Sequence, residues 1–140
     1  MITYVDTSTL LRLLVEEDGS ERAALIWDTA ESLASAALIG VEGRAALAAA
    51  DRSSRLTQAQ VKRAKAGLTE LIDEMSLVEI TEDLIEVAAD LAEVEQLRGY
   101  DAVHLAAALT IESDILTSAD TALCDAAERR GLHIANPLDR

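Results

Sequence analysis

Short aliphatic runs alternate with longer segments of helical periodicity along this chain. Strands are expected at 2–5, 77–80, 115–117 and 133–135, with a weaker candidate at 33–35. Runs of this length and composition are typical of buried strands. Because helical segments separate the runs, we expect the strands to pair in parallel, with helices on both faces of the sheet. The alternation therefore predicts an α/β fold built on a parallel sheet.

Three of the intervening helices have recognisable ends. Thr81 precedes aliphatic residues at three- and four-residue spacing, which is typical of a helix N-cap. Thr57 and Gln60 match a capping box, and Gly131 follows two arginines, as is common after the last turn of a helix. Further helices are expected at about 8–15, 21–32, 37–50 and 102–111.

Length and composition indicate one globular domain. The 140 residues leave room for one hydrophobic core, so residues 1–140 are expected to form a single domain. The N-terminal segment lacks the basic and apolar stretches of a secretion signal, which predicts a cytoplasmic protein. A single cysteine, Cys124, and two histidines, His104 and His133, argue against a zinc site of the Cys/His type.

The net charge of -14 restricts the partners that the surface can bind. Only 12 Lys and Arg residues stand against 26 Asp and Glu residues, so most of the surface should repel nucleic acids and anionic membranes. Eight basic residues offer a local exception, either near the acids discussed below or in one short stretch: Arg12, Arg44, Arg98, Arg52, Arg55, Lys62, Arg63 and Lys65. They form either a positive path for phosphate or an ordinary solvated surface.

Three aspartates stand where strands end or helices begin. Asp6 and Asp120 follow the predicted strands at 2–5 and 115–117, and Asp101 precedes a helical run. In parallel sheets, ligands bind outside the carboxyl ends of the strands, near the point where the strand order reverses. These acids are therefore candidates for one shared site. Each is also in a position where an aspartate commonly caps a helix.

Glu42 is a carboxylate on an apolar helix face. It shares that face with Leu38 and Ala45, and burial of an ionised carboxylate without a partner is costly. A cation shared with the three aspartates would compensate, and carboxylate ligands favour Mg²⁺ or Mn²⁺. The alternative is a glutamate that reaches solvent at the helix edge. His104, one turn after Asp101, either positions a substrate or transfers a proton, or simply packs in the core.

Four segments together carry a family resemblance. They are VDTSTL at 5–10, Glu42, YDAVHLAAA at 100–108 and LTSAD at 116–120. Their order and spacing resemble the PIN-domain family, most closely the VapC toxins of bacterial toxin–antitoxin pairs. The resemblance implies a three-layer α/β/α sandwich around a parallel five-stranded sheet. It also implies Mg²⁺-dependent cleavage of RNA by an endoribonuclease.

The resemblance assigns roles to individual residues. In that family four acids form a Mg²⁺ site for RNA cleavage, and the matching residues are Asp6, Glu42, Asp101 and Asp120. Of these, we expect Asp6, Asp101 and Asp120 to bind the metal and Glu42 to help orient the attacking water. Supporting polar residues match Ser8 and Ser118, although Ser118 stands where the family often has threonine. A VapB-like antitoxin is the implied protein partner and RNA the implied substrate. Ala-rich, aliphatic helices also favour a homodimer.

Two other classes of function stay open at this point. In an aspartyl-phosphate enzyme, Asp6 would accept the phosphate, but this class predicts a second aspartate at the position of Ser8 or a lysine after a later strand. The sequence has neither, since its last lysine is Lys65. In a non-catalytic binding module, the acids would only dock a basic partner. The presence of all four acids argues against this module.

Overall fold

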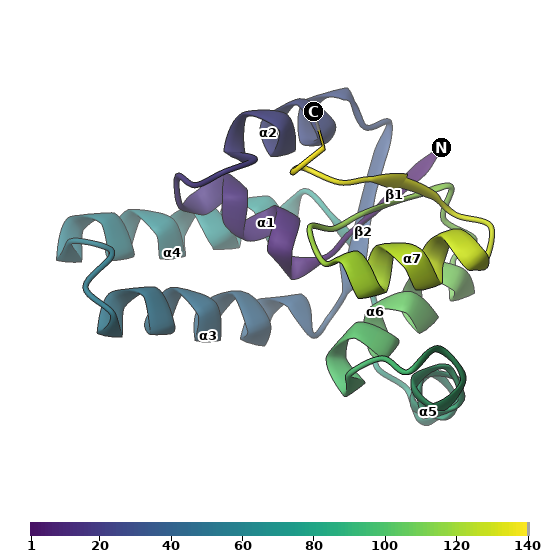
Figure 1. The fold of residues 1–140 in the computed structure, drawn as a ribbon. Coiled ribbons are helices and arrows are strands. Elements are labelled where there is room, and N and C mark those ends of the chain that lie inside the picture. The colour runs from purple at the N-terminus through teal and green to yellow at the C-terminus, as the bar shows by residue number, and fades with distance from the viewer. Residues whose placement is uncertain (140) are drawn as a thin grey trace.

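A computed structural model of the protein describes residues 1–139 and contains one parallel sheet (Figure 1). The strand order is β3-β2-β1-β4-β5, and every neighbouring pair is parallel. The strands are β1 (Ile2–Val5), β2 (Ser32–Ala36), β3 (Ser76–Val78), β4 (Ile115–Thr117) and β5 (His133–Ala135). All five predicted strands are present, including the weaker candidate, which forms β2. The predicted parallel sheet is therefore confirmed.

Seven helices connect the strands in the described residues. They are α1 (Thr7–Leu14), α2 (Ser20–Thr29), α3 (Ile39–Arg52), α4 (Gln58–Asp73), α5 (Glu82–Glu95), α6 (Gly99–Thr110) and α7 (Thr121–Arg129). The predicted second helix extends too far, because the chain already enters β2 at Ser32. The predicted start of α6 is also wrong. This helix begins at Gly99, so Asp101 lies inside its first turn.

The predicted helix ends are confirmed by their hydrogen bonds. Thr57 and Gln60 form a complete capping box at the start of α4. The hydroxyl of Thr81 accepts a hydrogen bond from the Leu84 amide at the start of α5. Gly131 lies two residues after the last residue of α7 and has a φ of 92°. Glycine adopts this left-handed conformation without strain, and the helix does not continue through it.

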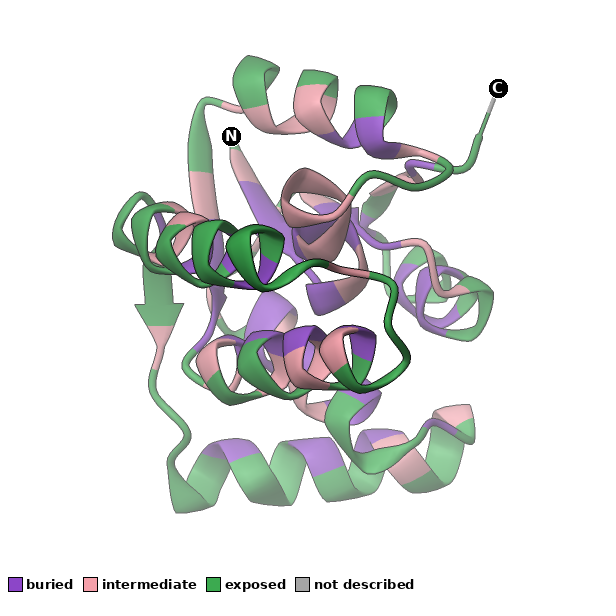
Figure 2. Cartoon of the chain, turned by 90° about the vertical axis from the view of Figure 1, so that its left-hand side faces the viewer, coloured by how far each residue is buried: buried purple, intermediate pink, exposed green. Residues whose placement is uncertain are grey.

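The core is divided between the two faces of the sheet. Tyr4 and Leu116 face a cluster that includes residues of α5, α6 and α7. The neighbouring Val5 points to the opposite face, into a cluster with residues of α1, α3 and α4. Side chains that alternate along β1 thus anchor both helical layers. Figure 2 shows the buried surfaces of these helices turned inward.

Helices α3 and α4 form a hairpin that projects away from the sheet (Figure 1). A Cβ atom at Gly43 would lie 2.9 Å from the Cδ1 atom of Leu68 on α4. Glycine at this position permits the contact without a shift of the Leu68 side chain. The contact fixes the first turn of α3, in which Glu42 lies next to Gly43.

The strand order reverses between β1 and β4. From the central β1 the chain proceeds outward through β2 and β3, then returns to the other side of β1 to form β4. Such a reversal opens a crevice beyond the carboxyl ends of the two strands. Asp6 follows β1 directly and Asp120 lies three residues after β4. None of the helices in residues 1–139 is long and apolar enough to cross a membrane.

Candidate active site

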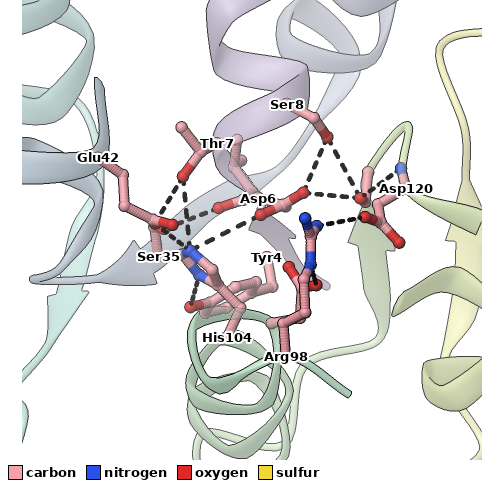
Figure 3. A network of polar contacts seen from close by, with 12 residues as sticks. Tyr4, Asp6, Thr7, Ser8, Ser35, Glu42, Arg98, His104 and Asp120 are labelled. Atoms are coloured by element: carbon pink, nitrogen blue, oxygen red, sulfur yellow. Dashed lines mark hydrogen bonds and ion pairs between the residues drawn. The ribbon is translucent and has the colours of Figure 1, made fainter. Parts of the chain in front are cut away.

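Asp6 is buried at the end of β1, with an exposed fraction of 5%. It occupies the N-cap position of α1, but its side chain makes no capping hydrogen bond. Its Oδ2 atom instead accepts hydrogen bonds from the hydroxyls of Ser8 and Ser118, at 2.8 and 2.7 Å (Figure 3). The capping interpretation of Asp6 is therefore wrong. Two hydroxyls hold its carboxylate in a fixed orientation.

The two serines join the ends of β1 and β4. Their hydroxyl oxygens lie 3.2 Å apart. Ser8 Oγ accepts a hydrogen bond from the Ala119 amide at 2.9 Å, and Ser118 Oγ accepts one from the Asp120 amide at 3.0 Å. These contacts bind the start of α1 to the loop after β4. The position of Asp120 relative to Asp6 follows from them.

Asp120 is both a helix cap and a part of the site. Its Oδ1 atom accepts a hydrogen bond from the Leu123 amide at 3.0 Å, which caps α7. The capping interpretation of this residue is confirmed. Its Oδ2 atom accepts a hydrogen bond from Arg98 Nη2 at 2.9 Å. The cap therefore orients one carboxylate oxygen and leaves the other directed into the site.

Arg98 connects the third aspartate to the site. Its Nε atom donates to Asp101 Oδ2 at 3.0 Å, so the guanidinium bridges Asp101 and Asp120. Burial raises the pKa of Asp101, the charges of Asp120 and Asp6 raise it further, and the bond to Arg98 opposes the shift. The sequence had suggested Arg98 as a phosphate contact. It gave no sign that this residue bridges two of the acids.

Glu42 lies in the first turn of α3 with partners from two other helices. Thr7 Oγ1 donates to its Oε1 atom at 2.7 Å, and His104 Nε2 lies 2.5 Å from the same oxygen. Burial raises the pKa of Glu42, but the hydrogen bonds and the charge of His104 outweigh burial, so the net pKa is lowered. Protein side chains thus supply the partner that this carboxylate requires. Glu42 does not simply reach solvent.

His104 is fully buried beneath the acids, and both of its ring nitrogens have partners. Nδ1 lies 2.7 Å from the hydroxyl of Tyr4, and Nε2 also lies 3.7 Å from Asp6 Oδ1. Burial lowers the pKa of His104, but the bond to Glu42 and the charges of Asp6, Glu42 and Asp101 raise it above its ordinary value. The packing interpretation is therefore incomplete. His104 links β1 and α3 from its position on α6.

The four predicted acids thus meet in one network, and three further residues join it that were not predicted as site residues. These are Tyr4, Thr7 and the bridging Arg98. Two of them had a sequence signal, because Thr7 directly follows Asp6 and Arg98 lies close to Asp101, but nothing in the sequence indicated Tyr4.

Comparison with known protein families shows to which family this chain belongs. Residues 3–129 match the PIN domain, a range that contains all four acids. The chain belongs to the PIN-domain family. Ribonuclease VapC45 of Mycobacterium tuberculosis (strain CDC 1551 / Oshkosh) is 38% identical over 110 residues, which cover 79% of this chain and 76% of the relative.

Solved structures agree on the PIN-domain fold. FitAcB from Neisseria gonorrhoeae has a TM-score of 0.72 at 18% identity, and the match covers 100% of both chains. A toxin–antitoxin complex from Klebsiella pneumoniae has a TM-score of 0.63 at 18% identity and covers 99% of both chains. The overall fold of this chain is therefore shared by these proteins.

The oxygen atoms grouped at this edge of the PIN domain are of a type that suits a hard cation. Three carboxylates and two serine hydroxyls are the donor atoms at the edge, and an arginine cation already bridges two of the carboxylates. Among residues 1–139, no three acidic, histidine or cysteine side chains are grouped to coordinate one ion as they stand. The type of these donor atoms fits a divalent metal. Their present arrangement does not yet form a coordination site, because Arg98 bridges Asp101 and Asp120.

A cavity of about 570 Å³ adjoins the acids of the PIN domain. Its charged lining residues are Glu42, Arg98 and Asp101, and Ile85 and Ala88 of α5 belong to its mostly apolar wall. Tyr100, which is 64% exposed, lies at the same cavity. Two of the four acids thus line a mostly apolar groove between α5 and α6.

Proposed function

We propose that this PIN-domain protein is a metal-dependent endoribonuclease and the toxin of a VapBC-type toxin–antitoxin pair in the cytoplasm. The observation that carries the proposal is the meeting of Asp6, Asp101 and Asp120 beside an ionised Glu42 at the point where the strand order reverses. The relative in M. tuberculosis that is named a ribonuclease supports the same reaction.

We assign Asp6, Asp101 and Asp120 to hold Mg²⁺ or Mn²⁺, because such cations prefer carboxylate oxygens. A bound divalent cation supplies an activated water and stabilises the charge on the leaving oxygen of a phosphodiester. Ser8 and Ser118 keep Asp6 oriented for this task. Arg98 bridges Asp101 and Asp120 in this structure, so it would have to release their oxygens for a cation to use both, and the released guanidinium would suit a substrate phosphate.

Glu42 orients the attacking water in this mechanism. Thr7 and His104 both bond to its Oε1 atom, and no group among residues 1–139 bonds to Oε2. Oε2 therefore remains to accept a hydrogen bond from water. The lowered pKa of Glu42 keeps the side chain an acceptor at neutral pH. His104 acts as a positioning residue because it touches Glu42 and lies out of reach of solvent.

The test of nuclease activity uses protein purified free of any inhibitor. It should cleave structured RNA in Mg²⁺ or Mn²⁺ and stop when EDTA is added. Asp101→Asn keeps the shape of the side chain but removes its charge, and should abolish cleavage. Asp125→Asn is the matched control, because Asp125 is an exposed aspartate on α7 and is absent from the polar network. Cleavage that persists in EDTA would contradict the metal mechanism.

The proposed antitoxin is expected to occupy the apolar groove between α5 and α6 and to place a basic side chain at the acids. The toxin–antitoxin complex with a similar fold supports a partner of this kind. Co-expression with the gene adjacent to this one should yield a complex without nuclease activity. A complex that retains full activity would argue against the assignment. Sedimentation at high protein concentration tests the proposed homodimer, which a purely monomeric species would exclude.

A further inference from the structure

Positive charge is concentrated in one part of this acidic protein. Residues 43–69 contain six of the 12 Lys and Arg residues but only one of the 26 Asp and Glu residues. The other 113 residues therefore carry six basic and 25 acidic side chains. The chain of net charge -14 thus contains one segment, residues 43–69, with a net charge of +5, and its other residues together are strongly negative.

This segment makes up most of the α3–α4 hairpin, which begins at the candidate active site, and the two ends of the hairpin add the acids Glu42, Glu70 and Asp73. Glu42 lies in the first turn of α3, and the hairpin extends from there away from the sheet (Figure 1). Arg44 and Arg52 are eight residues apart, which places them on one side of α3. Arg55 follows in the turn, and Lys62 lies in the first half of α4. At 1.5 Å per residue, Arg52 lies about 15 Å from Glu42 along the helix.

The basic side chains of the hairpin are exposed and make no ion pairs within the described residues. The six are Arg44, Arg52, Arg55, Lys62, Arg63 and Lys65. Elsewhere the arrangement differs, because Arg12, Arg98, Arg129 and Arg130 all contact carboxylates. Arg22 on α2 is exposed and unpaired in the described structure, but it stands alone. In Figure 2 much of the ribbon of the hairpin has the colour of exposed residues.

We propose that the α3–α4 hairpin binds the phosphate backbone of the RNA substrate and guides it to the acids. The proposal rests on the proposed ribonuclease function. It explains how a polyanion approaches a protein that repels it elsewhere, because the exposed basic side chains of the hairpin begin at Arg44, two residues after Glu42. Binding is independent of base sequence, since it uses charge alone. It requires RNA that extends several nucleotides beyond the bond to be cut.

The salt dependence of RNA binding tests the proposal without cleavage. The variant Arg52→Gln, Arg55→Gln, Lys62→Gln and the parent are titrated with a fluorescent 20-nucleotide oligouridine in EDTA. Each lost phosphate contact on single-stranded RNA reduces the slope of log K against log salt by about 0.7. The triple variant should therefore have a slope shallower by about 2. Its affinity at 0.1 M salt should be about 100-fold lower if both proteins bind equally at 1 M.

A matched control separates local contact from total charge. The variant Arg22→Glu, Leu25→Glu lowers the net charge by the same three units on α2, where both residues are exposed. It should bind RNA with the slope of the parent. Equal slopes for the triple variant and the parent would overturn the proposal, and so would an equal reduction in the α2 control. Circular dichroism melts confirm that both variants fold.

Cleavage assays distinguish failure of this inference from failure of the proposed function. With long structured RNA and Mg²⁺, the triple variant should have a raised KM and an unchanged kcat, because its acids are intact. If the parent cleaves RNA but the triple variant has the same KM and salt slope, the hairpin is excluded and the ribonuclease stands. If the parent does not cleave RNA but the slope changes as expected, the ribonuclease is excluded and the hairpin still binds RNA.

Discussion

Tyr4→Phe tests whether the buried network under the acids stabilises the protein. The change removes one hydroxyl and leaves the ring in place. That hydroxyl lies 2.7 Å from His104 Nδ1, and both side chains are fully buried. Loss of one partner from a buried hydrogen bond costs about 1–3 kcal/mol, because the remaining polar atom has no water to replace it. For a domain of this size, the melting temperature should fall by about 4–12 °C.

Urea denaturation in EDTA measures the loss in the free energy of unfolding. Tyr100→Phe is the matched control, because Tyr100 is 64% exposed and loses a hydroxyl that water already solvates. Its free energy of unfolding should stay within about 0.5 kcal/mol of the parent. A double-mutant cycle with His104→Asn should give a coupling energy of about 0.5–3 kcal/mol. Equal stability of the two phenylalanine variants, or a coupling of zero, would refute the reasoning.

Three further predictions concern charge at the site. The variant Arg98→Ala should bind Mn²⁺ more tightly than the parent in a calorimetric titration, because no guanidinium has to be displaced from Asp101 and Asp120. Equal or weaker binding would show that Arg98 does not compete with the metal. Excess Mg²⁺ should raise the melting temperature of the parent by mass action and that of Asp101→Asn by less, and equal shifts would remove Asp101 from the metal site. The pair of His104 and Glu42 should make stability depend on pH. The pKa of His104 is higher in the folded than in the unfolded state, so protonation of His104 stabilises the fold. This contribution is complete below pH 6.5 and is lost as pH rises through the folded pKa. The pKa of Glu42 is lower in the folded than in the unfolded state, so ionisation of Glu42 also stabilises the fold. This contribution is complete above pH 4.5 and is lost as pH falls through the folded pKa. In denaturation measured in EDTA, Glu42→Gln should therefore lose most stability between pH 4.5 and 6.5, and a loss independent of pH would count against the ion pair.

The sequence predicted the position of a residue correctly where that position follows from the local periodicity of apolar residues. Short aliphatic runs marked the strands, and Asp6 and Asp120 were found because the carboxyl ends of parallel strands converge at one edge. The start of α6 was misplaced because the segment Gly99–Tyr100–Asp101 has no apolar periodicity and contains a glycine, although tertiary packing extends the helix through it. Asp101 was therefore expected before a helix that in fact contains it.

Contacts between distant segments could not be predicted in the same way. Tyr4 and His104 are 100 residues apart, and their hydrogen bond depends on how α6 sits against β1. The bridge from Arg98 to Asp120 depends on the separate placement of α6 and α7. No periodic pattern encodes these distances. The identity of the acids was therefore predictable, while the partners that set their pKa values required the structure.

The pairing of Asp6 with Ser118 has a consequence for synthesis of the protein. These two residues are 112 positions apart, and β4 is the strand that brings them together beside β1. A ribosome makes Asp6 among the first residues of the chain. A growing chain that has released only its first hundred residues lacks four members of the polar network, Asp101, His104, Ser118 and Asp120. The acids therefore assemble only when translation is almost finished. The proposed ribonuclease therefore has an incomplete site for as long as most of its chain is being synthesised.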